Sequence, residues 1–342
     1  MPKYPVPTLT DVAKKAGVST ATVSRCLNTP NHVAKRTRDR VAETITALGY
    51  TPNFGARMMA SKRTYTIGAI IPTMENAIFA RGIQAFQDEL HRQGYTLLVA
   101  SSSYDPKIEE EQIRTLISRG ADGLLLIGHD RSSEIIDYLE AQDIPTLVAW
   151  AHDPNARLPS IGFDNFRAMS SLIKHILNLG HREIGLISAK TEFNDRARYR
   201  LMAVQQGMIR AGLDPTTIRL IETQYGIETG EVAFNEIIKA AHPPTVIICG
   251  NDVLATGALK KAKSLGISIP DDISVTGFDD IELAQCVSPK LTTVHVPHRE
   301  MGKQAAQTVI KMVNKEVFEK NKELDSYLKI RQSLGKPKIN IS

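Results

Sequence analysis

A short stretch near the N-terminus, STATVSRCLN at 19–28, carries several hydroxyl groups and one arginine at helical spacing. At 100° per residue, Val23, Cys26 and Leu27 fall on one side of a helix. The opposite side carries short side chains and Arg25. Small side chains let a helix approach a surface closely, hydroxyls can bond phosphates or base edges, and arginine can donate two parallel bonds to guanine. This chemistry predicts a helix that contacts the major groove of DNA.

Two further helices, predicted before and after this stretch, would hold it in place. Four apolar residues within 9–16 share one helix face, and Thr8 or Thr10 can cap that helix. Ser19 can cap the second helix, and a third apolar pattern runs through 41–48. Because three short helices joined by tight turns can share one small core, we predict an all-α helix-turn-helix head. Its first helix would brace the second against the duplex.

Positive charge is concentrated in this part of the chain. Residues 1–63 hold 11 Lys/Arg against 3 Asp/Glu, whereas the remainder holds 31 against 34. A basic head on a slightly acidic body favours a polyanionic partner. Two alternatives stay open. One is a solvated basic tail, although a disordered arm needs no regular apolar spacing, and the other is a helical hairpin whose polar face meets only solvent.

From residue 65 onward, apolar runs rich in β-branched residues alternate with amphipathic stretches. The predicted strands read TIGAII, TLLVAS, GLLLI, PTLVAW, EIGLISA, TVIICG and ISVTGF. The predicted helices lie within 79–93, 106–119, 165–180, 196–212 and 253–266. Such alternation builds parallel sheets covered by helices on both faces. Since the two sets of strands separate near 160–165, we predict an α/β body of two doubly wound parallel-sheet lobes with a cleft between them.

Polar and aromatic residues follow the predicted strands at their carboxyl ends, where ligands bind in such sheets. They are 73–79, His129 and Asp130, Trp150, 194–200, Asn251 and Asp252, and Asp279 and Asp280. We predict that these loops converge on a polar pocket. An ordinary alternative stays open for several of them. The aspartates at 252 and 279 can cap helices, Trp150 can belong to the core, and Arg196 can pair with a carboxylate.

The sequence resembles the LacI/GalR family of bacterial transcription regulators, whose heads read like DVAxxAGVSxxTVSRxLN. The match continues through TRDRVAETITALGYTPNFGARMMASKRTYTIGAIIP and, in later blocks, over nearly the whole chain. The resemblance implies a repressor with lobes of periplasmic-binding-protein type that acts as a homodimer on double-stranded operator DNA. The predicted parts are a head at 1–50, a hinge at 51–64, a first lobe at 65–161 and 292–320, and a second lobe at 162–291 and 321–335.

The resemblance also assigns roles to residues of the head. It implies that Thr20, Ala21 and Arg25 read bases, and that backbone contacts come from Thr10, Ser19, Thr22, Ser24 and Asn28. In similar regulators a hinge leucine wedges into the minor groove, and here Met59 takes its place. If the hinge were only a linker, any polar residue would serve at 59. The family often has serine where this chain has Ala34, so a helix cap is missing there.

The family's effector-binding positions fall here on Asn76, Phe79, Trp150, Arg200, Tyr225, Asn251 and Asp279. Carboxylate, amide and guanidinium groups bond hydroxyls, and aromatic rings cover a sugar face, so a small sugar-like effector fits. Arg196 stands one helical turn from Arg200 and can point the same way. Together with His129, these two arginines favour an anionic effector such as a sugar acid.

Other functional classes lack their motifs. The chain has no Gly-x-Ser-x-Gly, Walker or Gly-x-Gly-x-x-Gly pattern, and its three cysteines form no metal-binding pair. We therefore predict no catalytic site, metal or cofactor. Two alternatives use the same cleft, namely a sugar-binding protein and a sugar-active enzyme with Asp279 as a base.

Two further observations concern location and assembly. No apolar run reaches about 18 residues, and the N-terminus lacks the apolar core of a secretory signal, so we expect a cytoplasmic protein without a membrane partner. No long heptad repeat follows the body. A dimer is therefore expected rather than a tetramer held by a coiled coil.

Overall fold

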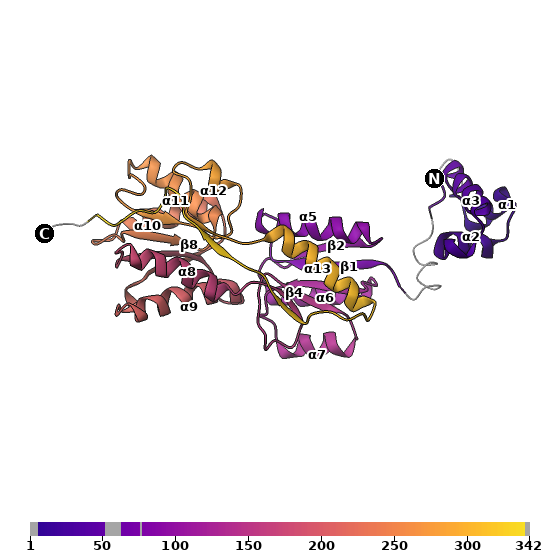
Figure 1. Cartoon of the computed structure of the whole chain (residues 1–342), viewed down its shortest axis with the longest axis horizontal. Coiled ribbons are helices and arrows are strands. Elements are labelled where there is room, and N and C mark those ends of the chain that lie inside the picture. The colour runs from indigo at the N-terminus through magenta and orange to yellow at the C-terminus, as the bar shows by residue number, and fades with distance from the viewer. Residues whose placement is uncertain (1–5, 52–62, 76, 339–342) are drawn as a thin grey trace. The chain divides into compact units, whose positions relative to one another are not determined.

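The computed structural model describes residues 6–51, 63–75 and 77–338. The chain divides into two compact units, residues 1–65 and 66–342, which we call the head and the body (Figure 1). Over the described residues, no helix has the length and apolar character needed to cross a bilayer.

The head is a bundle of three short helices. They are α1 (Leu9–Ala16), α2 (Thr20–Asn28) and α3 (Lys35–Leu48), with a 3₁₀ turn at Pro30–His32. Val12, Val23 and Val41, one from each helix, are buried together at its centre. The spacing of apolar residues therefore places one face of every helix in a common core.

Local hydrogen bonds define where these helices begin. Thr8 and Asp11 form a reciprocal capping box, in which the Asp11 N–H donates to Thr8 Oγ1 and the Thr8 N–H donates to Asp11 Oδ2. The Ser19 hydroxyl accepts from the Thr22 N–H at 3.1 Å and caps α2. Helix α3 starts after Ala34, which offers no side-chain acceptor. Its first turn therefore lacks the capping bond that the first two helices have.

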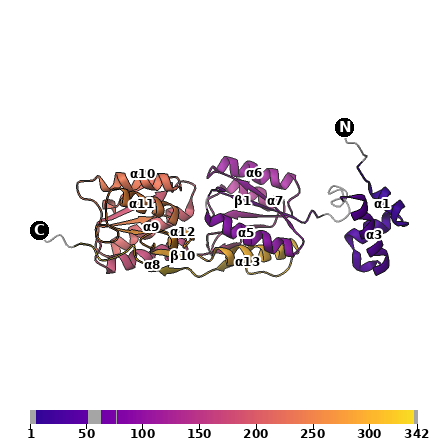
Figure 2. The ribbon, with the colours of Figure 1, turned by 90° about the horizontal axis from the view of Figure 1, so that it is seen from above.

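The first sheet of the body has six parallel strands in the order β11-β5-β4-β3-β1-β2. The strands are β1 (Thr66–Ile71), β2 (Thr96–Ser101), β3 (Gly123–Ile127), β4 (Thr146–Ala149), β5 (Ser160–Gly162) and β11 (Asn321–Glu323). Helices α5 (Ala77–Arg92) and α13 (His298–Val313) cover one face, and α6 (Pro106–Ser118) and α7 (Ser133–Ala141) cover the other (Figure 2). We call this assembly lobe 1.

Strand β3 shows why both faces of this sheet are covered. Side chains alternate between the faces of a strand. Leu125 packs with the α5 and α13 side, whereas Leu124 and Leu126 pack with the α6 and α7 side. All three are fully buried, which explains why this strand reads as a continuous apolar run.

Lobe 2 repeats this plan with four parallel strands in the order β7-β6-β8-β9. The strands are β6 (Ile184–Ala189), β7 (Arg219–Thr223), β8 (Val246–Cys249) and β9 (Ser274–Thr276). Helices α8 (Asn165–Asn178) and α9 (Asp195–Arg210) cover one face, and α10 (Ile227–Ile238), α11 (Asp252–Ser264) and the short α12 (Leu283–Cys286) lie on the other. A 3₁₀ turn spans Pro215–Thr217. Each lobe is thus a doubly wound unit.

The chain crosses between the lobes three times. It passes from β5 into α8, returns through β10 (Thr293–His295) to α13, and leaves again through β12 (Tyr327–Lys329). Strands β10 and β12 pair antiparallel and join the lobes. One predicted boundary is wrong, because residues 321–323, predicted in lobe 2, form β11 beside β5 in the sheet of lobe 1. This strand is short and polar, so it carries no apolar signal.

Candidate DNA-binding helix and interlobe cleft

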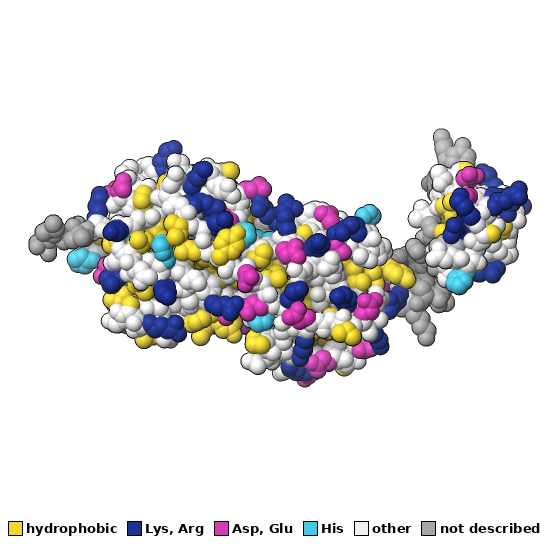
Figure 3. All heavy atoms as spheres, in the orientation of Figure 1, with side chains coloured by type: hydrophobic (Ala, Val, Ile, Leu, Met, Phe, Trp, Pro, Cys, Tyr) yellow, Lys and Arg dark blue, Asp and Glu magenta, His cyan; other side chains and the backbone are white. Residues whose placement is uncertain are grey.

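The outward face of α2 is accessible. Thr20, Ala21 and Arg25 are exposed, whereas Val23 is buried in the head core. Arg25 Nε donates to the carbonyl oxygen of Ala21 at 3.4 Å, which directs the guanidinium along the helix. The head carries many more Lys/Arg than Asp/Glu side chains on the face seen in Figure 3. A short-chained helix face on a basic unit has the chemistry needed to enter a major groove.

The remaining predicted DNA contacts lie at several places in the head. Thr10 is exposed on α1, and the hydroxyls of Ser19 and Thr22 lie 2.9 Å apart at the start of α2. Ser24 is half-buried on α2. Asn28 ends α2 with its side chain outside the described part, and Met59 lies outside the described residues.

A cleft of about 850 Å³ opens between the two lobes. The loops after β1, β2, β6 and β7 supply its walls, as expected for the carboxyl ends of parallel strands. Its lining residues include Met74, Ser103, Tyr104, Lys107, Lys190, Glu192, Phe193, Asn194 and Tyr225. The volume falls within the range of small-molecule sites, which is about 300 to 1,000 Å³.

Two tyrosines from opposite lobes face each other in this cleft. The rings of Tyr104 and Tyr225 have centroids 6.2 Å apart and an interplanar angle of 51°. Burial raises the pKa of both phenols, so each hydroxyl stays neutral and able to donate. Sequence reasoning missed Tyr104. The signal was available, because its loop follows β2 just as the predicted loops follow their strands.

Arg200 is buried close enough to Tyr104 and Tyr225 to act on their hydroxyls electrostatically, and its guanidinium is already bonded. Its Nε donates to Asn165 Oδ1 at 2.9 Å, and its Nη1 donates to the carbonyl oxygen of Gly250 at 2.7 Å. The guanidinium carbon lies 3.7 Å above the centre of the Phe278 ring. These contacts hold Arg200 in one position and use several of its donors.

Two polar groups near Arg200 are buried with unused hydrogen-bonding atoms. Asn251 caps α11 through its Oδ1, which accepts from the Leu254 N–H at 2.9 Å. Its Nδ2 and the Oδ2 of Asp279 are buried without a hydrogen-bond partner among the described residues. Burial raises the pKa of Asp279 well above its ordinary value, although the Arg200 charge opposes this. Buried polar atoms are normally paired, so these two atoms are exceptions among the described residues.

Phe79 and Trp150 lie in the core of lobe 1. Trp150 is 2% exposed, and its Nε1–H donates to His298 Nδ1 at 3.2 Å. Burial lowers the pKa of His298 to about 3, so the imidazole is neutral, and its Nε2 lies 3.2 Å from the carbonyl oxygen of Asp279. Trp150 therefore packs in the core of lobe 1, and its role as an effector contact stays a prediction.

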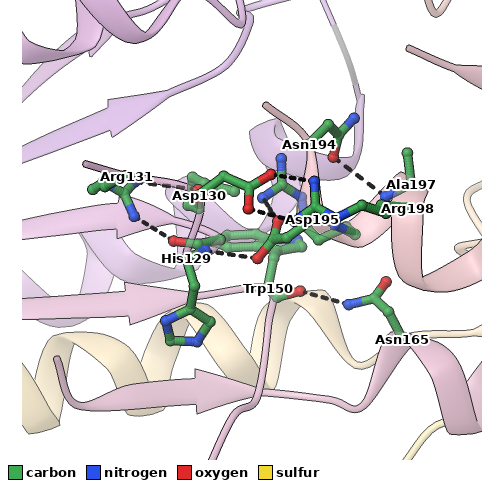
Figure 4. Close-up of polar contacts among 12 residues, drawn as sticks. His129, Asp130, Arg131, Trp150, Asn165, Asn194, Asp195, Ala197 and Arg198 are labelled. Carbon is green, nitrogen blue, oxygen red and sulfur yellow. Dashed lines mark hydrogen bonds and ion pairs between the residues drawn. The ribbon is translucent and has the colours of Figure 1, made fainter. Parts of the chain in front are cut away.

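A group of charged residues joins the lobes beside the cleft, and Figure 4 shows it. Asp195 Oδ2 accepts from the backbone N–H of His129 at 2.6 Å, and its Oδ1 accepts from Arg196 Nη1 at 2.8 Å. The Asp130 carboxylate accepts two bonds from Arg198, at 2.5 and 2.7 Å. We call His129, Asp130, Asp195, Arg196 and Arg198 the interlobe cluster.

This cluster removes two of the arguments for an anionic effector. Arg196 is 7% exposed and its charge is balanced by Asp195, so it acts within the protein. Burial lowers the pKa of His129, which leaves its imidazole neutral at pH 7. The ordinary alternative for Arg196, pairing with a carboxylate, is what the structure contains.

Comparison with known proteins decides the family. Residues 8–53 match the family model described as bacterial regulatory proteins, lacI family, and residues 173–334 match a periplasmic binding protein-like domain. The HTH-type transcriptional repressor PurR of Photobacterium profundum is 32% identical over 323 residues, which cover 93% of this chain and 96% of that protein. The HTH-type transcriptional repressor CytR of Escherichia coli K12 is 32% identical over 332 residues, covering 95% of this chain and 96% of that protein. The chain belongs to the LacI family.

Solved structures of LacI-family proteins share the fold of both units. A LacI-family transcriptional regulator from Silicibacter pomeroyi has a TM-score of 0.87 at 26% identity, covering 96% of this chain and 99% of that one. The lac repressor dimer bound to operator and the anti-inducer ONPF has a TM-score of 0.84 at 25% identity, covering 96% and 99%. The helix-turn-helix head and the parallel-sheet lobes of periplasmic-binding type are confirmed.

The predicted effector positions, seven from the family resemblance and Arg196 from its helical spacing, separate into groups in this chain. Tyr225 lines the cleft, whereas Arg200, Asn251 and Asp279 are buried. Phe79 and Trp150 lie in the core of lobe 1, Arg196 belongs to the interlobe cluster, and Asn76 lies outside the described residues. These positions remain predictions as effector contacts.

Proposed function

We propose that this LacI-family chain is a cytoplasmic repressor that binds operator DNA as a homodimer and senses a small neutral sugar in the interlobe cleft. The single observation that carries the DNA half is the exposed face of α2 with Arg25, held on a basic three-helix head. Phosphate contacts would supply non-specific affinity, and Arg25 would supply discrimination between bases.

Operator binding tests this half directly. Fluorescence anisotropy with the chain's own upstream promoter region, against random DNA, measures discrimination at several salt concentrations. Because a bidentate arginine contact distinguishes bases by about 1 to 3 kcal/mol, Arg25→Ala should lose that much discrimination. Arg210→Ala, an exposed arginine of α9 in the body, is the matched control. Equal discrimination by the Arg25 variant and the wild-type protein would contradict the assignment.

A neutral sugar fits the cleft better than a sugar acid. The aromatic pair of Tyr104 and Tyr225 offers ring faces, and the unpaired atoms of Asn251 and Asp279 offer a donor and a carboxyl group. Arg200 already donates to neutral acceptors inside the protein. Arg200 keeps its charge beside these neutral acceptors, and Lys107 and Lys190 line the cleft, so the preference for a neutral sugar rests on the unpaired polar atoms and not on a lack of positive charge.

A thermal-shift screen with sugars, sugar acids, phosphosugars and nucleobases tests the effector half. A ligand that binds only the folded body raises its melting temperature. We expect a neutral sugar to do so, and Tyr225→Ala to abolish the shift. If sugar acids alone stabilise the protein, the preference for a neutral ligand is wrong. Testing the hit in the operator assay then gives the sign of its effect.

Support for a homodimer comes from apolar side chains on edge strands. Leu98 and Val99 of β2 are 36% and 38% exposed, and Leu220 of β7 is 39% exposed. Exposed apolar residues on sheet edges are typical of protein interfaces. A dimer would place two heads on half-sites about 34 Å apart. Val99→Asp should yield a monomer in analytical ultracentrifugation and weaken operator binding, and an unchanged dimer would refute this interface.

The enzyme alternative has its own test. If Asp279 served as a base, a purified sample would turn over a sugar and Asp279→Ala would abolish that activity. We expect no turnover, because the relatives of the chain are transcriptional repressors.

A further inference from the structure

The interlobe cluster joins the two lobes through protein groups alone. We propose that it keeps the cleft closed in the absence of effector, so that the closed form is the resting form of the body. The proposal rests on the proposed function only in treating the cleft as the effector site. It names how that site is regulated, namely by an internal contact that does not involve the ligand.

The first component is the ion pair between Asp130 and Arg198. Asp130 follows β3 in lobe 1, and Arg198 lies in the first turns of α9 in lobe 2. Both nitrogens at the end of the guanidinium donate to the carboxylate, at 2.7 and 2.5 Å. The two side chains are 22% and 40% exposed, so water screens the pair only in part. Such two-point pairing is both stronger and more selective in geometry than a single contact.

The second component is the bond from the His129 N–H to Asp195. Asp195 is 2% exposed, so the backbone of lobe 1 contributes to covering a carboxylate of lobe 2. Burial alone would raise the pKa of Asp195, but Arg196 and the His129 N–H lower it below its ordinary value. Asp195 is therefore ionised at pH 7. Opening the lobes would take away one of the hydrogen bonds that stabilise this charge.

Gly128 allows the lobes to come this close. A Cβ atom at 128 would overlap Arg196 Nη1 and an oxygen of Asp195, and the backbone there has φ +72°. Only glycine adopts that conformation without strain. The absence of a side chain at this position is thus a requirement of the closed arrangement.

Other contacts across the lobes are weaker or lie near the crossing strands. Arg81 pairs with Glu282, but that glutamate is 83% exposed, and exposed ion pairs contribute little. The contact between His298 and the Asp279 carbonyl oxygen lies beside the crossing strand β10, where a hinge motion moves atoms least. The cluster lies farther out, at the ends of β3 and β6, so opening must break it.

The consequence for the effector follows from population arithmetic. For a ligand that binds only the closed form, the apparent Kd equals the intrinsic Kd divided by the fraction of protein that is closed. If the cluster already closes the lobes, the effector does not have to supply that free energy. Its own contacts then decide which compound is recognised.

Pulsed electron paramagnetic resonance measures closure without any effector. In the full-length chain, with Cys26 and Cys286 changed to serine, nitroxide labels at Glu134→Cys on α7 and Met202→Cys on α9 report the interlobe distance. Glu134 and Met202 are both exposed, and the helices that carry them, α7 and α9, belong to lobe 1 and lobe 2 respectively. A large excess of unlabelled chain keeps distances between protomers out of the signal.

We expect one short interlobe distance for the wild-type protein and a longer, broader distribution for Arg198→Gln and for Asp130→Asn. The charge-swapped pair, Asp130→Arg with Arg198→Asp, should restore the short distance. Arg157→Gln is the matched control, because Arg157 pairs with Asp137 and Glu140 within lobe 1. A wild-type protein that is mostly open, or single variants that stay closed, would overturn the proposal.

Amide hydrogen exchange gives a second readout. The N–H of His129 is protected by Asp195 only when the lobes meet, so it should exchange about five- to tenfold faster in Arg198→Gln, as expected for an ion pair of about 1 kcal/mol. Unchanged exchange at His129 would count against the proposal. Neither measurement uses an effector. A sugar screen without a hit would therefore contradict the proposed ligand class without altering these results.

Discussion

The buried carboxyl group of Asp252 predicts a specific pH dependence of stability. Asp252 is the first residue of α11 and is 0% exposed. Its Oδ2 accepts from the Ile281 N–H at 2.8 Å, and its Oδ1 accepts from the Thr293 hydroxyl at 2.6 Å. It therefore ties lobe 2 to the crossing strand β10. Burial raises the pKa of Asp252 to about 7, although these two hydrogen bonds oppose the increase.

The sign and size of the effect follow from this shift. The unfolded chain ionises near the ordinary value of 3.8, whereas the folded protein holds its proton up to about 7. Stability from this group is thus fully present below 3.8, is lost as the pH rises toward 7, and stays lost above 7. At 1.36 kcal/mol for each unit of pKa, the loss is about 4 kcal/mol.

Asp252→Asn isolates this contribution, because the amide has the same shape and does not ionise. Its oxygen can accept from the Ile281 N–H, and its nitrogen can donate to the Thr293 hydroxyl. The variant's free energy of unfolding, relative to wild type, should rise by about 4 kcal/mol between pH 4 and pH 8. Urea unfolding followed by tryptophan fluorescence measures it in the body alone, since Trp150 is the only tryptophan.

A control variant has the opposite sign and a lower pH range. Lys338 and the Ser268 N–H lower the pKa of the exposed Asp272, so Asp272→Asn should lose relative stability as the pH rises toward the ordinary value of 3.8 and change little between pH 4 and pH 8. A difference between Asp252→Asn and wild type that stays constant from pH 4 to pH 8 would refute the reasoning. It would mean that the carboxyl group is solvated or paired in a way that the packing does not reveal.

Two further variants test the start of α3 in the head and the buried Arg200 in the body. Ala34→Ser supplies the missing acceptor at the start of α3 and should stabilise the head by about 1 kcal/mol in thermal unfolding followed by NMR, and no gain would mean that the first turn is satisfied otherwise. Arg200→Ala leaves Asn165 Oδ1 and the Gly250 carbonyl oxygen without their donor, so it should destabilise the body by about 2 to 5 kcal/mol in urea unfolding as well as abolish the effector response. If this variant responded at the same ligand concentration as wild type, the prediction that Arg200 contacts the effector would be wrong.

The strands that could be predicted from the sequence are those that are buried on both faces. The strands at 66–71, 123–127 and 184–189 are buried along their whole length and read as apolar runs. Strand β7, by contrast, is an edge strand with the sequence RLIET and mixed exposure, and β11 reads NKE. These two strands are defined by their backbone hydrogen bonds and not by a pattern of side chains. Neither an apolar run nor an alternation of apolar and polar residues therefore revealed them.

The site was predictable at the level of loops but not of side chains. The rule that ligands lie beyond strand ends located the loops that meet at the cleft. It did not say which way each side chain turns. Trp150 adopts φ +62° and packs inward against His298, and Arg196 is held by the residue just before it. Such outcomes depend on packing partners from distant parts of the chain, which no local pattern encodes.

On the proposed function, discrimination between effectors rests on the unpaired polar atoms of buried residues. Arg196, Arg198 and Arg200 all have partners inside the protein, and those partners fix their positions. The unpaired atoms of Asn251 and Asp279 are therefore the groups that a ligand would satisfy. A site built to bond a hydroxyl rejects an analogue without it strongly, because the buried groups then remain unpaired. Deoxy analogues of the true effector should consequently bind far more weakly than size alone would predict.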